Sequence, residues 1–357
     1  MEWKAGPMGF FLPWILLCGM TSQASAFSTP IAAEDTPRPA QYYDDYFKTL
    51  PSMEGMTVAI TGCSRGLGYV AASTVVRKGG RVLLLNRKTN AMEWYDELCQ
   101  VADAASGPKP IHVECDLLSF DSVNSASQKV SELTADSGGL DVLCCNAGIM
   151  LQPDQASKDG YDITASTNML SHFLLVKNLF GQLLVQASSS ETARVVIMSS
   201  ASGYGEPAFN PTFFEKKGGQ LGGQKASYER YHQSKLANLA FCCSLQEKLD
   251  NAKISNVIAL ACTPGVCGTD MFRHATSLFS KDGTPLPLSN VPNVKDGCMA
   301  QLKCIFDPTV QPGELWGPGK EGSLVRTDMS PPTVLIDEEA KKALWQVCED
   351  AVGKFEI

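Results

Sequence analysis

Residues 57–68, TVAITGCSRGLG, decide the fold, because a short apolar run leads directly into three closely spaced glycines. The run Thr57–Thr61 predicts a buried strand, and the pattern after the glycines predicts a helix up to about Lys78. Glycines at such a turn permit a tight bend and let a pyrophosphate approach the backbone at the start of a helix. The stretch therefore indicates a dinucleotide site, with an ordinary structural turn as the alternative.

The same alternation of strand and helix continues along the chain. Apolar, often β-branched runs predict further strands at residues 81–85, 111–115, 140–145, 194–198 and 256–262. Helical patterns lie between them, at residues 92–105, 122–135, 163–185 and 226–249. Continuous apolar strands separated by helices are typical of a parallel sheet that is covered on both faces. The predicted fold class is therefore α/β, a doubly wound parallel sheet in a single domain, with its ligand at the carboxyl ends of the strands.

Two segments interrupt this rhythm, one Gly-rich and polar at 203–225 and one with three prolines at 271–293. Both predict long loops, and we expect them to determine the substrate. At the end of the chain, apolar residues near helical spacing predict a helical extension within 331–357 that packs on the domain. These residues are Leu344, Val347, Cys348, Ala351 and Phe355.

Composition limits the class of protein. Hydrophobic residues make up 44% of the 357 residues and the mean hydropathy is −0.06, which is typical of a soluble globular protein. The formal net charge of −8 and the pI near 5.1 argue against a nucleic-acid partner. After the N-terminus, no segment offers the roughly 20 apolar residues that a membrane-spanning helix needs. We therefore expect no integral membrane span in the mature chain.

The N-terminus has the pattern of a signal peptide at residues 1–26. Lys4 precedes an apolar run at 8–20, and Ala24-Ser25-Ala26 has the spacing of a cleavage site. A short membrane anchor is the alternative. Cleavage before a phenylalanine, followed by a short segment containing Ser, Thr and Pro, is similar to the bipartite presequences of algae with secondary, red-lineage plastids. We therefore predict a transit or linker segment at 27–50 and a plastid location, with the ER or secretion as alternatives.

Thirteen cysteines are present, but no Cys-x2-Cys pair and no histidine with metal-ligand spacing accompanies them. Cys144-Cys145 lies in an apolar strand pattern and Cys242-Cys243 in a helical one, where cysteine behaves as a small buried hydrophobe. We therefore predict free thiols, no metal site and a reducing compartment, rather than a disulfide framework.

Tyr231 and Lys235 stand four residues apart in a helical pattern, so both lie on one helical face. A fixed positive charge favours the phenolate and brings the pKa of a phenol down from about 10 towards neutral pH. Such a pair suits proton exchange with an alcohol or a carbonyl. The same spacing also occurs by chance on solvated helices, so the neighbouring motifs must decide.

The residues after the second strand indicate which dinucleotide binds. A site for NAD would be expected to place Asp or Glu here, against the ribose hydroxyls. Arg87 and Lys88 stand there instead, and Arg65 lies inside the glycine loop. Because arginine can hold a phosphate through two parallel hydrogen bonds, these cations predict a 2′-phosphate and therefore NADP(H). Ordinary surface charges are the alternative.

In this order the motifs resemble those of the short-chain dehydrogenase/reductases, in the single-domain Rossmann-type branch that uses Thr-Gly-x3-Gly-x-Gly. The resemblance covers about residues 54–330 and implies an NADP-binding catalytic domain. It implies that the cofactor is contacted by Gly62, Ser64, Arg65, Gly66, Leu67, Gly68, Arg87, Asp116, Asn146, Ala147, Gly148, Tyr231, Lys235, Pro264, Gly265 and Thr269. Of these, Asp116 is implied to contact the adenine. The implied catalytic residues are Asn168, Ser200, Tyr231 and Lys235.

The resemblance also implies a role for each catalytic residue. Tyr231 exchanges a proton with the substrate oxygen as hydride is transferred, and Ser200 hydrogen-bonds the same oxygen. Lys235 lowers the pKa of Tyr231 and bonds the nicotinamide ribose. Asn168 holds a water in the proton relay. Ser199 is the alternative to Ser200.

Within the family, residues 234–241, SKLANLAF, are similar to the retinol dehydrogenase and WW-domain oxidoreductase group, which implies an apolar carbonyl or alcohol substrate. The C-terminal LWQVCE is similar to light-dependent protochlorophyllide reductases, a plastid alternative from which 146–148 and 231–235 differ. A non-catalytic NADP-binding sensor usually has a broken tetrad, and a sugar-nucleotide epimerase has another glycine spacing. Whether the chain forms a homo-oligomer stays open.

Overall fold

The computed structural model describes residues 36–357 except for 88–91, 188–191, 274, 276–286 and 330–335. The chain divides into residues 1–35 and 36–357, and the first of these units lies outside the described residues. The predicted signal peptide and the first part of the predicted segment 27–50 therefore lie outside the described residues as well. Among the described residues, no helix is both long enough and apolar enough to cross a membrane.

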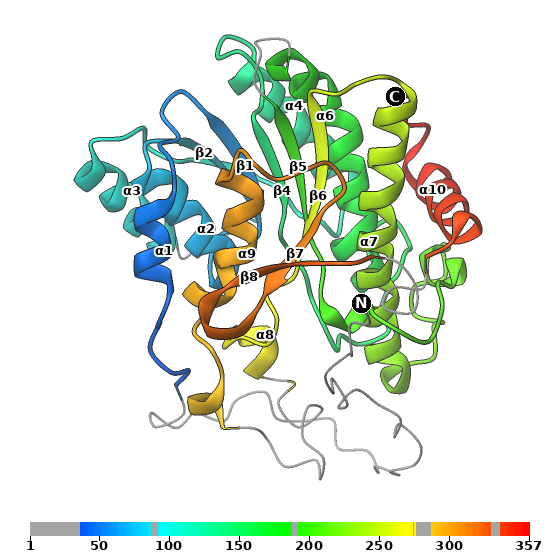
Figure 1. The fold of residues 1–357 in the computed structure, drawn as a ribbon. Coiled ribbons are helices and arrows are strands. Elements are labelled where there is room, and N and C mark those ends of the chain that lie inside the picture. Colours follow the sequence, from blue (N-terminus) through cyan, green and yellow to red (C-terminus); the bar gives the residue numbers. More distant parts are fainter. Residues whose placement is uncertain (1–35, 88–91, 188–191, 274, 276–286, 330–335) are drawn as a thin grey trace, which may run out of the picture. The chain divides into compact units, whose positions relative to one another are not determined.

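A single eight-stranded sheet forms the centre of the second unit, in the order β3-β2-β1-β4-β5-β6-β7-β8 (Figure 1). The strands are β1 Thr57–Thr61, β2 Arg81–Asn86, β3 Ile111–Glu114, β4 Val142–Cys145, β5 Ala193–Met198, β6 Val257–Cys262, β7 Leu315–Pro318 and β8 Leu324–Thr327. All neighbours pair in parallel except β7 and β8, which are antiparallel. The order reverses between β1 and β4, where ligands bind in doubly wound sheets. The predicted fold class is confirmed.

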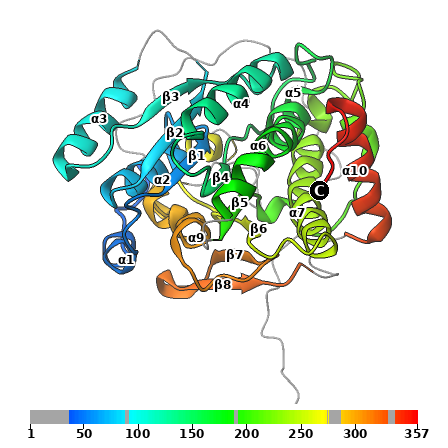
Figure 2. The ribbon, with the colours of Figure 1, turned by 90° about the horizontal axis from the view of Figure 1, so that it is seen from above.

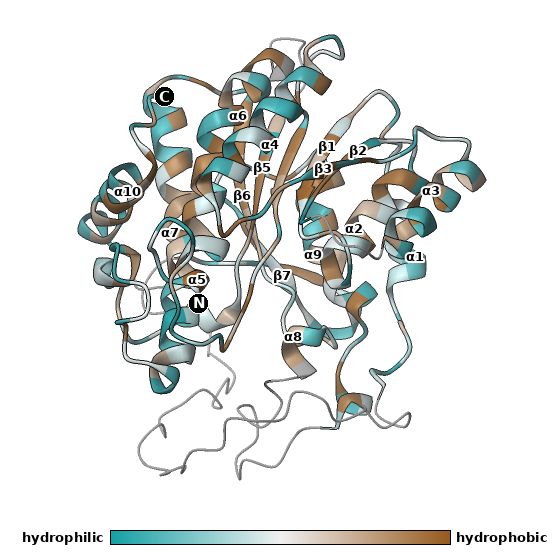
Figure 3. Cartoon of the chain, turned by 180° about the vertical axis from the view of Figure 1, so that it is seen from behind, coloured by the Kyte–Doolittle hydropathy of each residue, from teal (hydrophilic) through white to brown (hydrophobic). Residues whose placement is uncertain are grey.

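Helices cover both faces of this sheet (Figure 2). One layer holds α1 Tyr43–Thr49, α2 Gly66–Arg77, α3 Glu93–Ala105 and α9 Val294–Phe306, and the other holds α4 Phe120–Thr134, α5 Ile163–Ala165, α6 Ser171–Ala187, α7 Ser227–Asn251 and α10 Glu338–Val352. Along β1, Val58 and Ile60 face the first layer and Ala59 faces the second. Because both faces are buried, the central strands are hydrophobic over most of their length (Figure 3).

The sequence patterns did not reveal α1, α9, β7 or β8. Helix α1 lies inside the segment 27–50 that was expected to be a transit or linker segment, yet it packs on α2 and α9. The carboxylate of Asp296 accepts the backbone N–H groups of Gln41, Tyr42 and Tyr43 at 2.9–3.0 Å. The hydroxyl of Tyr43 is 2.7 Å from that of Thr74 on α2. The packed domain therefore begins before residue 54.

The C-terminal helix α10 lies against α7 and α6 through an aromatic cluster. Trp345 stacks on Phe355 with ring centroids 5.5 Å apart, and both contact Phe173 of α6. The helix ends at Val352, because Gly353 takes a φ of +84°, so the chain turns back and Phe355 packs from outside the helix. The predicted C-terminal extension is thus helical within residues 338–352.

The twelve described cysteines are all free, as the sequence predicts, and ten of them are buried. Burial raises the pKa of the Cys144 and Cys267 thiols to about 12. Cys99 and Cys243 are half-buried. Within the described part of the chain, no cluster of three or more His, Cys, Asp or Glu side chains is placed to hold a metal ion.

Candidate active site

The carboxyl ends of the central strands bring the sequence-predicted site residues together. The glycine loop follows β1, and Asn146-Ala147-Gly148 follows β4. Ser200 comes two residues after β5, and Pro264 comes two residues after β6. Helix α7 supplies Tyr231 and Lys235 to the same edge. Residues spread over two hundred positions of sequence therefore meet at one edge of the sheet.

The glycine loop is shaped for close approach of a ligand backbone. Gly62 and Gly66 have left-handed φ values of +71° and +60°, which favour glycine. A Cβ on Gly68 would lie 2.2 Å from the carbonyl oxygen of Gly62, so no other residue fits there without a shift. Ser64, Arg65 and Leu67 complete the loop, and α2 begins at Gly66. This strand–glycine turn–helix arrangement fits the pyrophosphate of a dinucleotide at a helix N-terminus.

Side chains from neighbouring strands hold this loop in place. Asn146 Nδ2 donates to the carbonyl oxygens of Thr61 and Gly62 at 2.8 and 3.2 Å. Gln301 of α9 donates to Asn146 Oδ1 at 3.1 Å. On the other side, the backbone N–H of Cys63 donates to Asn86 Oδ1 at 2.8 Å. Gln301 and Asn86 were not recognised as site residues, because their sequence neighbourhoods carry no motif.

Tyr231 and Lys235 are both buried on the inner face of α7. Lys235 Nζ donates to the carbonyl oxygen of Met198 at 3.0 Å and lies 5.8 Å from the centroid of the Tyr231 ring. The Tyr231 phenol is hydrogen-bonded to Ser200. Ser199, the alternative to Ser200, instead donates its hydroxyl to the carbonyl oxygen of Lys235 at 2.8 Å. Ser199 therefore joins β5 to α7, and Ser200 is the serine beside the phenol.

The pKa values of this pair differ from the expectation that Lys235 lowers the pKa of Tyr231. Burial raises the pKa of Tyr231 to about 12, although the hydrogen bond from Ser200 pulls it down. Burial lowers the pKa of Lys235 to about 8, although the nearby Cys262 raises it. Desolvation disfavours the charged form of each group and is the largest cause of both shifts. At neutral pH the phenol of Tyr231 therefore carries its proton.

Asn168 lies in a single π-helical turn, Ser166–Leu170, that interrupts the helix predicted at 163–185. Its Oδ1 accepts the backbone N–H of Ile149 at 2.8 Å. Its Nδ2 donates to the carbonyl oxygen of Ile149 and to Ser234 Oγ, each at 2.9 Å. Both amide hydrogens are thus used to hold the segment after β4 against α7. A relay water would need the main-chain carbonyl of Asn168, which faces His172 Nδ1 at 3.2 Å.

Two histidines near the site are structural. His172 is buried between Thr61 Oγ1 and the carbonyl oxygen of Asn168, and burial lowers its pKa to about 4. His232 is also buried. Its Nδ1 and Nε2 lie 2.5 and 2.7 Å from the carbonyl oxygens of Ser202 and Pro207. It therefore ties the start of loop 203–225 to α7.

The cationic residues lie on the outer side of the site. Arg87 is exposed directly after β2. The end of this strand lies beside the glycine loop, because the backbone N–H of Gly62 donates to the carbonyl oxygen of Leu85 at 3.1 Å. Arg65 is also exposed and pairs with Asp270, with Nε and Oδ2 3.5 Å apart. Lys88 lies outside the described residues. Arg65 and Arg87 therefore have no buried structural role. They follow the strands at whose carboxyl ends the ribose of a dinucleotide would lie.

The remaining predicted cofactor contacts lie in turns after β3 and β6. Asp116 Oδ1 accepts the N–H of Leu118 at 3.1 Å, so this carboxylate stabilises its own turn. Gly265 has a φ of +65°, and the N–H of Phe272 bonds Thr269 Oγ1 at 3.3 Å. The methyl group of Thr269 would be 3.8 Å from a Cβ on Gly66. The segment after β6 therefore reaches the glycine loop.

Apolar side chains surround the Tyr231 phenol. Met150 and Ala275 are buried with it in one small cluster, and Leu151, Tyr228 and Met271 pack against them. A Cβ on Gly148 would lie 3.4 Å from Lys235 Nζ and 3.8 Å from the end of Met271. The Tyr231 ring therefore packs among apolar side chains from the segments after β4 and β6 and from α7.

A doubly wound sheet with a glycine turn after its first strand and a buried tyrosine–lysine pair defines a dinucleotide-dependent oxidoreductase. A family model described as short chain dehydrogenase matches residues 56–213. Retinol dehydrogenase 14 of Mus musculus is 31% identical over 328 residues, which cover 84% of this chain and 87% of that protein. Polyprenol dehydrogenase of Homo sapiens is 30% identical over 65% of this chain and 67% of its own length.

Solved structures agree. An uncharacterised protein from Mycobacterium paratuberculosis is 27% identical and superposes with a TM-score of 0.65 over 87% of this chain and 98% of that one. An NADPH-dependent 3-quinuclidinone reductase from Rhodotorula rubra, 23% identical, has the same fold at a TM-score of 0.52, over 80% of this chain and 96% of that one. The chain belongs to the short-chain dehydrogenase/reductase family and is retinol dehydrogenase-like. It is therefore an oxidoreductase that uses a nicotinamide cofactor and a small-molecule substrate.

Proposed function

We propose that this chain transfers hydride between NADP(H) and the carbonyl or alcohol group of an apolar molecule, as a retinol dehydrogenase-like enzyme does. The observation that carries this proposal is the buried Tyr231 phenol, hydrogen-bonded to Ser200 and surrounded by apolar side chains. The names of the relatives, retinol and polyprenol dehydrogenases, support an isoprenoid or lipid aldehyde as the substrate.

When bound, the nicotinamide supplies or accepts the hydride. Tyr231 donates its proton to the substrate oxygen in reduction, which suits a phenol that stays protonated at neutral pH. Ser200 stabilises the charge that develops on that oxygen. Lys235, which donates to the carbonyl oxygen of Met198 and lies beside Gly148, would bond the ribose. Asn168 fixes the backbone of Ile149, the residue after Gly148.

The preference for NADP(H) rests on the exposed guanidinium groups of Arg65 and Arg87 and on the absence of an acidic residue at position 87. A 2′-phosphate offers both arginines a charge-assisted hydrogen bond, which strengthens binding. Arg65 would then exchange its exposed partner Asp270 for the phosphate. Exposed ion pairs contribute only about 0–1 kcal/mol, so this exchange costs little.

The test is a panel of aldehydes and alcohols, from short aliphatic to retinoid and polyprenyl chains, assayed with NADPH and with NADH. We expect kcat/KM to rise with chain length and to be at least about tenfold higher with NADPH, because one charge-assisted contact is worth about 1.5–3 kcal/mol. Equal efficiency with both cofactors in the wild type, or an Arg87→Ala variant that keeps the full preference for NADPH, would contradict the role of Arg87 in binding the phosphate. Preference for short polar substrates would refute the apolar substrate.

We further propose a plastid address for the N-terminal residues that precede α1, with the ER or secretion as the alternative. Free, buried thiols support a reducing compartment. N-terminal sequencing of the mature protein should find cleavage after Ala26 or further along, between residues 27 and 42. An intact N-terminus on the mature protein would contradict the proposal.

A further inference from the structure

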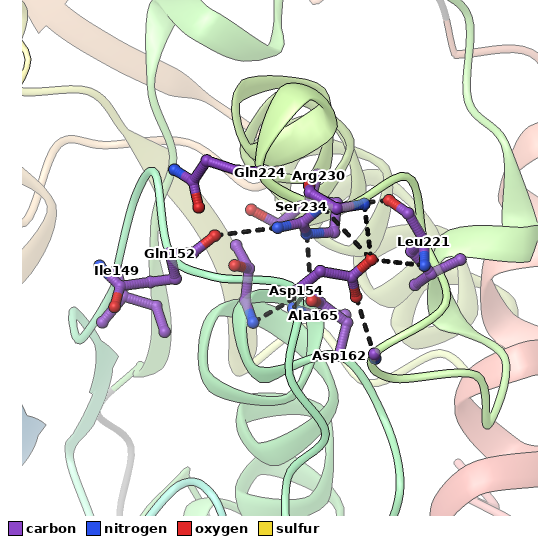
Figure 4. Close-up of polar contacts among 12 residues, drawn as sticks. Ile149, Gln152, Asp154, Asp162, Ala165, Leu221, Gln224, Arg230 and Ser234 are labelled. Carbon is purple, nitrogen blue, oxygen red and sulfur yellow. Dashed lines mark hydrogen bonds and ion pairs between the residues drawn. The ribbon is translucent and has the colours of Figure 1, made fainter. Parts of the chain in front are cut away.

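Arg230, the residue before Tyr231 on α7, is completely enclosed by the two loops that flank the site. Its side chain is 1% exposed. Nη1 donates to the carbonyl oxygens of Leu221 and Gly223 at 3.0 and 2.7 Å, and Nη2 donates to that of Gln152 at 2.9 Å (Figure 4). One guanidinium thus bonds the segment after β4 and the loop 203–225 at the same time.

Two buried carboxylates complete this arrangement. Asp162, 1% exposed, lies with Oδ2 3.1 Å from Arg230 Nε, and its Oδ1 accepts the N–H groups of Thr164 and Ala165 at the start of α5. Asp154, 6% exposed, lies 4.0 Å from Nη1 and accepts backbone N–H groups of the loop at 2.7–2.9 Å, from Gly219, Leu221 and Gly223. The two loops are therefore joined through charged groups that have been removed from water.

The segment held by Arg230 carries the apolar wall of the site. Met150 and Leu151 contact the cluster around Tyr231, and they immediately precede Gln152, whose carbonyl binds Arg230. Leu151 has a φ of +57°, a left-handed conformation that is strained for a residue with a branched side chain. Such a conformation persists only where the surroundings impose it. The bond from Arg230 to the next residue is a restraint of that kind.

We propose that Arg230 is a positioning residue that fixes the substrate-facing wall, Met150 and Leu151, relative to Tyr231. It acts through the backbone of both loops and touches neither the phenol nor the cofactor side of the site. The inference rests on the proposed function, because it assigns a cause to the affinity for the apolar substrate. Loss of the guanidinium releases the two loops together and leaves the reacting groups in place.

The test compares Arg230→Met with Arg194→Met. Arg194 is also buried and donates to three backbone carbonyls, those of Cys304, Ile305 and Asp307. It lies at the start of β5, whereas the site lies beyond the carboxyl end of that strand. We expect Arg230→Met to raise KM for a long-chain aldehyde by about tenfold, with kcat within about threefold and the Kd for NADPH within about twofold. Arg194→Met should lower Tm without changing KM. Arg230→Lys should recover part of the loss, since it keeps a charge beside Asp162.

Hydrogen exchange provides a readout that needs no activity. Amides of 150–154 and 219–223 should both exchange at least about tenfold faster in Arg230→Met than in wild type, and those near 303–307 should not. If Arg230→Met does not fold, Asp154→Asn should show the same pattern more weakly. An unchanged KM, or faster exchange in only one segment, would overturn the proposal. Absence of turnover in wild type would refute the proposed function, while the exchange data would still decide the role of Arg230.

Discussion

At the residue scale, burial shifts the pKa values of both groups at the centre of the site. Tyr231 and Lys235 lie four residues apart on α7. Because both are removed from water, the pKa of the phenol is raised and the pKa of the amine is lowered, so each shift disfavours the charged form. The protein therefore holds a protonated phenol next to an amine that can lose its charge near pH 8. This state suits proton donation to a carbonyl oxygen.

The pKa of Lys235 leads to an expected change of stability with pH. In the unfolded chain its pKa returns to about 10.5, so between about 8 and 10.5 the unfolded state binds a proton that the folded state lacks. This single group therefore makes the cofactor-free protein more stable as pH rises through that window. Tyr231, raised to about 12, opposes it only above about 10.

Lys235→Met removes this titration. We expect its Tm to exceed that of the wild type at pH 7, where the wild type buries an ammonium, and the difference to shrink towards pH 10. Differential scanning fluorimetry across that range measures it. A difference that stays constant with pH would show that Lys235 does not titrate in this window.

Gly68 provides a second test at this scale. Gly68→Ala should destabilise the protein by about 1–3 kcal/mol and weaken NADPH binding, because its Cβ would meet Gly62 O at 2.2 Å and Asn146 Nδ2 at 2.5 Å. Gly181→Ala is the matched control, since that glycine lies in α6 with no atom within 4 Å of an added Cβ. It should be neutral or stabilising by up to about 1 kcal/mol. Urea denaturation and fluorescence titration with NADPH distinguish the two.

At the element scale, one side chain makes three of the hydrogen bonds that attach helix α1. Asp296 accepts three successive backbone N–H groups at the start of α1, and hydrogen bonds to charged groups contribute about 1.5–3 kcal/mol in buried settings. Because this site is only half-buried, we expect Asp296→Ala to cost about 1–2 kcal/mol in urea denaturation. Asp103→Ala, which removes an exposed pair with Lys109, should stay within about 0.5 kcal/mol. An equal effect of both changes would mean that the hydrogen bonds from α1 to Asp296 contribute no more stability than an exposed ion pair.

The elements also show what the sequence could and could not predict. Strands β1 to β6 and their helices were predictable, because burial on both faces gives continuous apolar runs such as Thr57–Thr61. The edge strand β8 was not, because it is short, none of its four residues is buried, and it carries no long apolar run. The π turn at Asn168 was also missed, since the helical pattern of the side chains shows no sign of a local change in the backbone hydrogen bonds.

The same difference applies to the site. Tyr231, Lys235 and the glycine loop could be placed from motifs, because their spacing is local. Arg230, Gln301 and Asn86 could not, since each acts through partners that are distant in sequence, such as Gln152 for Arg230. The effect of burial on the pKa of Tyr231 was likewise invisible, because the sequence shows a charged neighbour but not the loss of water.

At the scale of the whole molecule, one sheet buries nearly all of the described thiols. Among the cysteines of residues 36–357 only Cys99 and Cys243 are half-buried, and burial raises the pKa of Cys243 to about 11. Since the thiolate is the reactive form, we expect Cys99 to react first with a thiol reagent in the native protein. Peptide mapping by mass spectrometry measures this, with urea-unfolded protein as the control. Rapid native labelling of Cys144 or Cys262 would contradict the packing.

The fold thus places the buried phenol of Tyr231 at the edge of the sheet where a nicotinamide cofactor binds. Proton transfer by Tyr231 is tested by single-turnover reduction of a long-chain aldehyde by the NADPH-loaded Tyr231→Phe variant. Tyr228→Phe, which removes a neighbouring hydroxyl, is the control. We expect Tyr231→Phe to be about 10²–10⁴-fold slower, with NADPH affinity and the rate of Tyr228→Phe nearly unchanged. A Tyr231→Phe variant that turns over at the wild-type rate would contradict proton transfer by this residue.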